Sequence, residues 1–185
     1  MNPYCHSAPD HPWHGPYHQR EYGFPVGSDQ ALFERLVLEI NQAGLSWLTV
    51  LKKRAAFQAA YDHFDIATVA HYDDEQRARL LADAGIIRNR RKVDAAIHNA
   101  SVILLLQQCH GSFKAWLDAH HPMPLERWVR LFKQTFRFTG PEIVNEFLMS
   151  TGYLPGAHSE DCPVFERILA SRPRWLSHPA QASSE

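Results

Sequence analysis

Hydrophobic positions repeat with helical spacing along most of this chain. Between residues 32 and 40, apolar side chains fall on one stripe of a helix, and Glu34 and Arg35 fall opposite to it. The same spacing recurs between residues 93 and 104. No alternation of apolar and polar residues lasts long enough to build a sheet. The pattern predicts an all-α fold with helices over residues 29–43, 46–63, 65–71, 74–84, 89–109, 112–120, 125–134, 141–151 and 163–171.

Short polar residues mark the starts of several of these helices. Ser28 or Asp29 can cap the first helix, and Ser46 can cap the second, because their side chains accept free main-chain N–H groups. Asp73–Gln76 resembles a capping box. Gly44 breaks the chain between the first two helices.

The composition is that of an ordinary soluble protein. The chain has 185 residues, of which 45% are hydrophobic and 21% are charged. We expect one helical domain over residues 1–175 and a disordered tail over 176–185, which is rich in Pro, Ser and Ala. No apolar run approaches the ~20 residues that span a bilayer, and residues 1–16 lack the pattern of a signal peptide. A cytoplasmic protein without a membrane partner follows, and we expect a monomer.

A carboxylate and an indole flank the break at Gly44. Glu39 falls at the margin of the apolar stripe, where it loses water and needs a partner. Trp47 begins the next helix and is followed by the cations of Lys52–Arg54. A salt-bridged Glu39 and a core Trp47 stay open as alternatives, and the cations can reach phosphate or only face solvent. Together these residues suggest a pocket for a flat, nitrogen-rich ring beside a polyanion.

The cations of the chain are clustered, although its net charge is only −1. One dense group contains Arg88, Arg90 and Lys92, and a further set recurs at near-helical spacing between residues 127 and 137. Each group lies beside a predicted junction of loop and helix. A solvated surface is the alternative to a phosphate-binding surface.

Residues 130–150 are predicted to form a helix, a short turn and a second helix. Gly140 frees the backbone of the turn, and Pro141 suits the first position of the second helix. Free N–H groups at such a helix start can hold a DNA phosphate without reading a base. This arrangement is typical of a helix-hairpin-helix motif.

Two cysteines and two histidines can form a metal site. Cys5 and His18 lie early in the chain, and His158 and Cys162 follow late in H-x-x-x-C spacing. Two thiolates and two imidazoles suit tetrahedral Zn²⁺ and leave no open position for water, so the site would be structural. Other histidines lie as near to Cys5 and compete as ligands: His6, His11 and His14.

The three cysteines of the chain, an odd number, argue against a disulfide framework. Cys109 lies inside a predicted helix, and we expect it to be a small core residue.

Two blocks, Gln42–Arg54 and Gly85–Lys92, carry specific signatures, and Tyr17-His18 and Phe136–Gly140 extend them. In these segments the chain resembles the bacterial 3-methyladenine DNA glycosylase I family of the helix-hairpin-helix glycosylase superfamily. The resemblance is strong over residues 17–100 and patchier beyond. It implies an all-α fold, double-stranded DNA with alkylated bases as the partner, and action on the bacterial nucleoid.

The implied reaction is hydrolysis of the bond between deoxyribose and 3-methyladenine, which leaves an abasic site. Glu39 would contact the flipped base and act as the catalytic residue, first by recognition and charge stabilisation and second by activating water. Tyr17 and Trp47 would stack around the base. No lysine is positioned for Schiff-base chemistry, so the enzyme would be monofunctional, without strand cleavage.

The resemblance also implies which residues contact the DNA backbone and which residues hold a metal ion. The turn, with Thr139 and Gly140, would dock on the DNA backbone together with the group at Arg88, Arg90 and Lys92. A structural zinc ion would be held by four residues: Cys5, His18, His158 and Cys162.

The chain departs from the family near the mouth of the pocket. The family usually has aromatic residues where this chain has Ser7 and His14. A non-catalytic relative, or one that recognises another modified base, is therefore the alternative function. A helical zinc scaffold without a DNA role is a third possibility.

Overall fold

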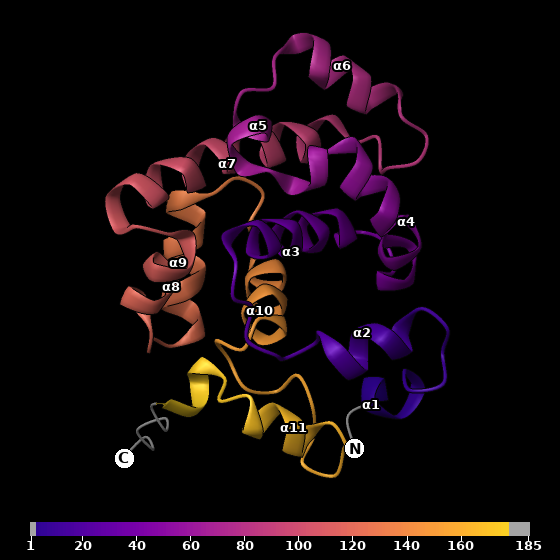
Figure 1. The fold of residues 1–185 in the computed structure, drawn as a ribbon, viewed down its shortest axis with the longest axis vertical. Coiled ribbons are helices and arrows are strands. Elements are labelled where there is room, and N and C mark those ends of the chain that lie inside the picture. The colour runs from indigo at the N-terminus through magenta and orange to yellow at the C-terminus, as the bar shows by residue number, and fades with distance from the viewer. Residues whose placement is uncertain (1–2, 178–185) are drawn as a thin grey trace. The chain divides into compact units, whose positions relative to one another are not determined.

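The computed structural model describes residues 3–177, which fold into helices joined by short loops (Figure 1). This part of the chain contains no strand, which confirms the all-α class. None of its helices is long and apolar enough to cross a bilayer. The elements are α1 (Pro3–Ser7), α2 (His14–Arg20), α3 (Asp29–Gln42), α4 (Trp47–Ala60), η1 (Asp62–Phe64), α5 (Ile66–Ala70), α6 (Asp74–Ala82), α7 (Arg90–His110), α8 (Phe113–His120), α9 (Leu125–Thr135), α10 (Pro141–Ser150), α11 (Phe165–Ala170) and η2 (Arg174–Ser177).

The predicted helices occur within two residues of their predicted ends, with one exception. The helix predicted over 46–63 is too long, because α4 ends at Ala60. The chain then turns through Asp62–Phe64, where φ takes the positive values 47°, 53° and 60°. The rings of Tyr61 and Phe64 stack across this turn with 5.7 Å between their centroids, so aromatic packing stabilises it.

Three predicted caps are confirmed. Ser28, Ser46 and Asp73 each accept a hydrogen bond from the main-chain N–H three residues ahead, at 3.2, 3.2 and 3.0 Å. Gly44 has a φ of 79°, a conformation that side chains disfavour, and it separates α3 from α4 as predicted.

The chain divides into two compact units. The larger unit comprises residues 27–147, and the smaller unit combines the segment before residue 27 with the segment from residue 148 onward. Helix α10 contains the boundary between them, so we retain a single domain over 1–175 as a proposal. We predicted a disordered tail over 176–185. Its first two residues, Leu176 and Ser177, are the last two of η2, and the others lie outside the described residues.

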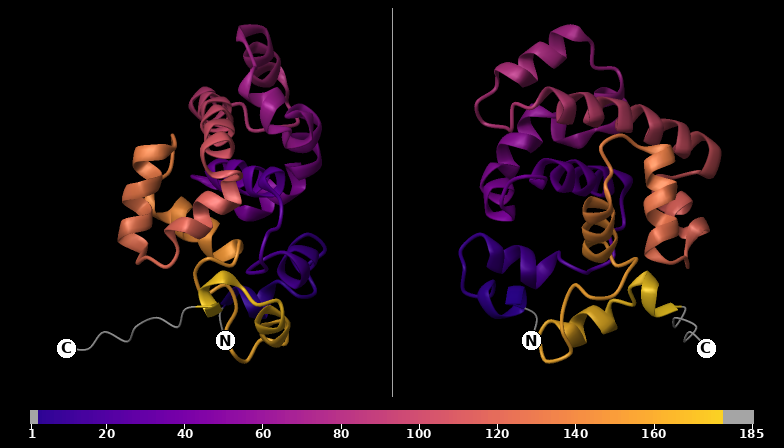
Figure 2. Two further views of the ribbon diagram at one scale, coloured as in Figure 1. Left: turned by 60° about the vertical axis from the view of Figure 1, so that its left-hand side comes forward. Right: turned by 180° about the vertical axis from the view of Figure 1, so that it is seen from behind.

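The larger unit has an aromatic and aliphatic core. Helix α7 packs against α5 and α8, and α3 packs against α4 (Figure 2). Burial of each large side chain stabilises the fold by about 2 kcal/mol. The fully buried side chains include Leu32, Phe33, Leu36, Phe57, Phe113, Trp128, Phe132 and Phe147.

Cys109 does not belong to this core, contrary to our prediction. It is exposed in the last turn of α7. Ile103 is the last fully buried residue of this helix, so the apolar face ends before Cys109.

The smaller unit joins two distant stretches of chain through main-chain hydrogen bonds. The N–H of Gly23 donates to the carbonyl of Ser150 over 3.0 Å. The N–H of Trp175 donates to the carbonyl of Gly152 over 3.2 Å. A small apolar cluster lies in this unit and consists of Cys5, Cys162, Val164 and Ile168, with Phe24 and Trp175 packed against it. Two of its members are candidate metal ligands.

Candidate metal centre and base-binding residues

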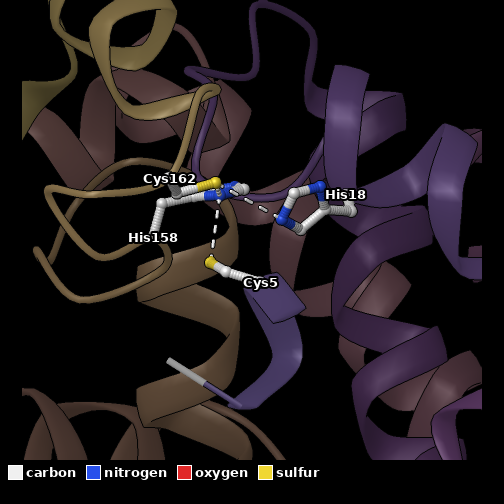
Figure 3. Close-up of side chains that lie close together, drawn as sticks. All are labelled: Cys5, His18, His158 and Cys162. Atoms are coloured by element: carbon white, nitrogen blue, oxygen red, sulfur yellow. Dashed lines mark hydrogen bonds between the residues drawn. The ribbon is translucent and has the colours of Figure 1, made fainter. Parts of the chain in front are cut away.

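The four predicted metal ligands lie together in the smaller unit (Figure 3). Cys5 comes from α1 and His18 from α2, while His158 and Cys162 come from a tight loop before α11. All four are buried, and their ligand atoms lie within 4.8 Å of one another. The predicted grouping is confirmed, and the group could hold a metal ion.

The spacing of the ligand atoms matches one tetrahedral shell. His158 Nδ1 lies 3.5 Å from Cys5 Sγ and 3.4 Å from Cys162 Sγ, and His18 Nε2 lies 3.7 Å from Cys162 Sγ. Metal–sulfur and metal–nitrogen bonds of zinc-like length place sulfur and nitrogen about 3.5 Å apart at tetrahedral angles. Four protein ligands at these distances leave no position for water, so the centre suits a structural role.

The ring of His158 is oriented for metal binding by the main chain. Its Nε2 donates to the carbonyl oxygen of Tyr22 over 2.9 Å, which leaves the lone pair of Nδ1 directed toward the thiols. Burial lowers the pKa of His158 to about 4, so its imidazole is neutral at ordinary pH, the form that binds metals.

The competing histidines have other partners or are exposed. His14 Nδ1 lies 3.1 Å from the hydroxyl of Tyr4. His11 Nδ1 accepts the main-chain N–H groups of Trp13 and His14 at 3.1 and 3.2 Å. His6 is exposed. The ambiguity that sequence spacing left open is therefore resolved in favour of His18.

Glu39 is a buried carboxyl group in α3, and only 3% of it is exposed. Burial raises its pKa to about 8, the charge of Arg35 opposes this rise, and the charge of Glu146 adds to it. Glu39 is therefore mostly protonated near neutral pH, and an arriving cation would favour its ionised form. A carboxyl group in this state can respond to the charge of a ligand.

Arg35 is the charged neighbour that sequence reasoning misplaced. It is only 5% exposed, whereas the helical pattern put it on the outer side of α3. Its position four residues before Glu39 is the signal that could have indicated it, since side chains at i and i+4 face each other on a helix.

Trp47 lies in the larger unit, and Tyr17 lies in the smaller unit. Trp47 is half-buried in the first turn of α4, directly after the cap Ser46. Tyr17 is buried in α2, and its ring lies 5.7 Å from that of Tyr22.

Two of the three cations after Trp47 bind the protein itself. Lys53 Nζ donates to the carbonyls of Ala84 and Gly85, both at 3.0 Å. Arg54 forms an ion pair with Glu34 at 2.8 Å. Of this group only Lys52 is exposed, so the group does not form a phosphate-binding patch.

Lys92 also binds the main chain, in contrast to its predicted contact with a phosphate. It is 5% exposed, and its ammonium donates to the carbonyls of Asn41 and Ala43 at 2.9 and 2.7 Å. These carbonyls end α3, so Lys92 stabilises the end of the helix that carries Glu39. Arg88 and Arg90 are exposed, and their phosphate contacts stay predictions.

The loop of residues 136–140 joins α9 to α10. Phe138 is its left-handed residue, with a φ of 61°, whereas Gly140, which we expected to free the backbone of the turn, does not have a positive φ. Thr139 Oγ1 donates to the carbonyls of Phe132 and Phe136 at 3.1 and 3.4 Å, which fixes the turn. Gly140 is exposed, and a side chain there would meet no atom within 4 Å. The start of α10 is therefore accessible to a ligand.

A model of the methyladenine glycosylase family matches residues 7–127. The chain belongs to this family. The chain is 36% identical to DNA-3-methyladenine glycosylase 1 of Escherichia coli (strain K12), over 74% of this chain and 83% of the relative. It is 33% identical to DNA-3-methyladenine glycosylase of Haemophilus influenzae, over 80% of this chain and 89% of the relative.

Solved structures agree with this assignment. The 3-methyladenine DNA glycosylase I of Staphylococcus aureus has a TM-score of 0.77 and 32% identity, covering 84% of this chain and 92% of its own. A substituted 3-methyladenine DNA glycosylase I in complex with 3-methyladenine has a TM-score of 0.80 and 31% identity, covering 89% of this chain and 97% of its own. This methyladenine glycosylase is thus an enzyme of the DNA-3-methyladenine glycosylase I class.

Proposed function

We propose that this methyladenine glycosylase hydrolyses the N-glycosidic bond of 3-methyladenine in alkylated double-stranded DNA and leaves an abasic site. The observation that carries the proposal is the buried carboxyl group of Glu39, whose pKa is raised to about 8 by burial. A related structure binds 3-methyladenine itself, and the curated relatives are named for this lesion.

The chemistry of the lesion suits these residues. A base inside the duplex must be extruded, which costs a few kcal/mol. Methylation at N3 gives the adenine a positive charge and weakens its bond to the sugar before any enzyme acts. Trp47 and Tyr17 would stack on the cationic ring, because aromatic faces attract cations. Glu39, ionised by the approaching charge, would accept a hydrogen bond from the exocyclic amine.

The 136–140 loop would act as the hairpin of a helix-hairpin-helix motif. Free N–H groups at the start of α10 favour an anion there, and Gly140 leaves room for a phosphate to approach. Thr139 would act indirectly, by holding the turn. Arg88 and Arg90 would contribute further contacts to the DNA backbone.

We further propose that the metal of the centre is zinc. Two cysteines and two histidines form a ligand set that zinc prefers, and Cys5, His18, His158 and Cys162 would hold it. Bound there, zinc would supply structural stability to the smaller unit and take no part in the reaction.

Base release from DNA tests the function. A duplex that carries 3-methyladenine is incubated with the protein, free base is quantified by chromatography, and strand breaks are measured without alkali. We expect free base and an intact strand, because no lysine is assigned to Schiff-base chemistry. Glu39→Gln and Trp47→Ala should each reduce release strongly while the helical circular dichroism is retained. Normal release by both variants would contradict the assignment of the pocket.

The same assay separates the alternative function. Tight binding of methylated DNA by the wild-type protein without release of any base would indicate a non-catalytic relative. Release from a different alkylated base would indicate altered specificity, which the departures at Ser7 and His14 make worth testing. A small panel of alkylated duplexes is therefore the appropriate substrate set.

A further inference from the structure

A concave site lies in the larger unit, between α6, α7 and the 136–140 loop. This loop runs beside α7 (Figure 2). Its volume is about 390 Å³, within the range of roughly 300–1,000 Å³ that small ligand sites occupy. Three guanidinium groups and one carboxylate line it. The lining residues are Arg77, Arg90, Asp94, Ile97, His98 and Arg137.

The charges of this arginine pocket do not cancel. Arg77 is neutralised and oriented by Asp94, at 2.7 Å, and by Asp74. Arg90 and Arg137 are exposed. The guanidinium group of each forms no ion pair and no hydrogen bond within residues 3–177. Two unpaired guanidinium groups therefore remain to bind an anion, and a guanidinium suits two oxygens of a phosphate at once.

Hydrogen bonds from Asn99 hold the main chain of Arg137 in place at the pocket. The side chain of Asn99, which is fully buried, accepts the N–H of Arg137 at 2.8 Å and donates to its carbonyl at 3.1 Å. Arg137 therefore extends from a fixed point three residues before Gly140. Burial and the nearby charge of Arg137 both lower the pKa of His98, which agrees with a positive field in the pocket.

We propose that the arginine pocket binds a phosphodiester group of the DNA duplex, next to the phosphate held at the start of α10. The inference rests on the proposed function because it takes DNA as the ligand. Phosphates follow one another every 3.4 Å of rise along each strand, so a protein that holds one phosphate has others close by. The volume of the pocket leaves space for the sugar atoms that flank a phosphodiester.

The salt dependence of binding to an undamaged duplex tests this inference. Fluorescence anisotropy of the full-length protein with a labelled duplex is measured between about 50 and 200 mM salt. Arg137→Gln should weaken binding several-fold and lower the slope of log K against log salt by about 1. Arg172→Gln is the matched control, since it removes the same charge from an exposed residue that follows α11 and belongs neither to the pocket nor to the basic groups of the sequence. Equal slopes for the two variants would overturn the proposal.

A second variant guards against a folding defect. Asp94→Asn removes the only carboxylate of the pocket lining, so it should tighten binding and steepen its salt dependence. A destabilised protein cannot produce this gain. Unchanged or weaker binding by Asp94→Asn would count against a phosphate site here.

A titration with inorganic phosphate distinguishes a phosphodiester ligand from a free phosphate ion. Phosphate is titrated against chloride at equal ionic strength while the arginine Nε–Hε resonances are followed. If phosphate shifts Arg137 but Arg137→Gln keeps the wild-type slope on DNA, the pocket binds small phosphates and the proposal is wrong. The undamaged duplex requires no catalysis, so a failure of base release by the wild-type protein would contradict the proposed function and leave the slope measurement valid.

Discussion

His158 donates a hydrogen bond through Nε2 to the main-chain carbonyl of Tyr22, over 2.9 Å. This bond fixes the tautomer of the ring, so the lone pair of Nδ1 faces the two thiols. It also connects a ligand from the late part of the chain to the segment just after α2. The orientation of the metal ligand therefore depends on main-chain geometry as well as on side-chain chemistry.

We predict one zinc ion per chain by elemental analysis. Removal with a chelator should lower the melting temperature by about 10 °C or more, because metal binding contributes several kcal/mol to folding. Calorimetry before and after chelation measures this shift. Cys162→Ser should reproduce the loss, whereas Cys109→Ser should retain the metal, since Cys109 is exposed and distant from the cluster in sequence. A fully stable protein without metal would contradict the assignment.

Gly23→Ala should weaken the metal centre without removing a ligand. Gly23 has a φ of 84°, and an added Cβ would lie 2.7 Å from Cβ of Ala157 and 3.5 Å from Cδ2 of His158. The strain and the clash should displace the His158 loop, so a competing chelator should extract metal faster than from the wild type. Gly27→Ala is the control, because its Cβ would meet nothing within 4 Å. Equal extraction rates from the two variants would refute the prediction.

The rate of base release should depend on pH through Glu39. Its pKa in the free protein is about 8. If the ionised carboxylate recognises the cationic base, kcat/KM should rise by up to about tenfold per pH unit below 8 and level off above it. The profile of Glu39→Gln should be flat over this range. A wild-type profile as flat as that of the variant would exclude ionisation of Glu39 from the reaction.

Glu39 should also make the folded state less stable as the pH rises. Its pKa is raised from 4.5 to about 8, so the folded chain binds the proton more tightly than the unfolded chain does. The stability that this proton provides is complete below about pH 4.5 and is lost progressively toward pH 8, by at most about 1.4 kcal/mol per pH unit. Urea unfolding of the wild type and of Glu39→Gln between these pH values measures the difference. Parallel curves for the two proteins would contradict it.

Lys92→Met should destabilise the protein by about 2–4 kcal/mol. The substitution leaves two main-chain carbonyls at the end of α3 without their donor. Base release should fall because the end of α3 shifts, whereas the salt slope of DNA binding should match that of the wild type. Lys52→Met, at an exposed position, is the control for stability. A reduced salt slope for Lys92→Met would instead support the contact between Lys92 and a DNA phosphate that the sequence suggested.

Helices and their caps could be predicted well because they depend on local spacing. The stripe through Leu36 and the cap at Ser46 are both visible within a few residues of sequence. The turn at Asp62–Phe64 could not be predicted, since stacking of Tyr61 on Phe64 offsets an unfavourable backbone there. The short helices α1 and α2 also escaped detection, because their segment has no apolar period to reveal them.

The site was predictable only in part, for a related reason. The choice of His18 over nearer histidines came from the resemblance, and the structure explains it by giving His11 and His14 other partners. The role of Lys92 was misjudged because a cation in a basic cluster gives no sign of its burial. Its acceptors, the carbonyls of Asn41 and Ala43, are main-chain groups distant in sequence and carry no side-chain signature.

The wide separation of the metal ligands has a consequence for synthesis of the protein. Cys5 and His158 are 153 residues apart, and Cys162 follows still later. A chain emerging from the ribosome offers two of the four ligands early and gains the others only when translation has passed residue 162. The complete centre therefore forms late, so a prematurely terminated chain that lacks Cys162 cannot acquire the full set of metal bonds. With the proposed zinc at this centre, metal content would distinguish chains that include Cys162 from truncated ones.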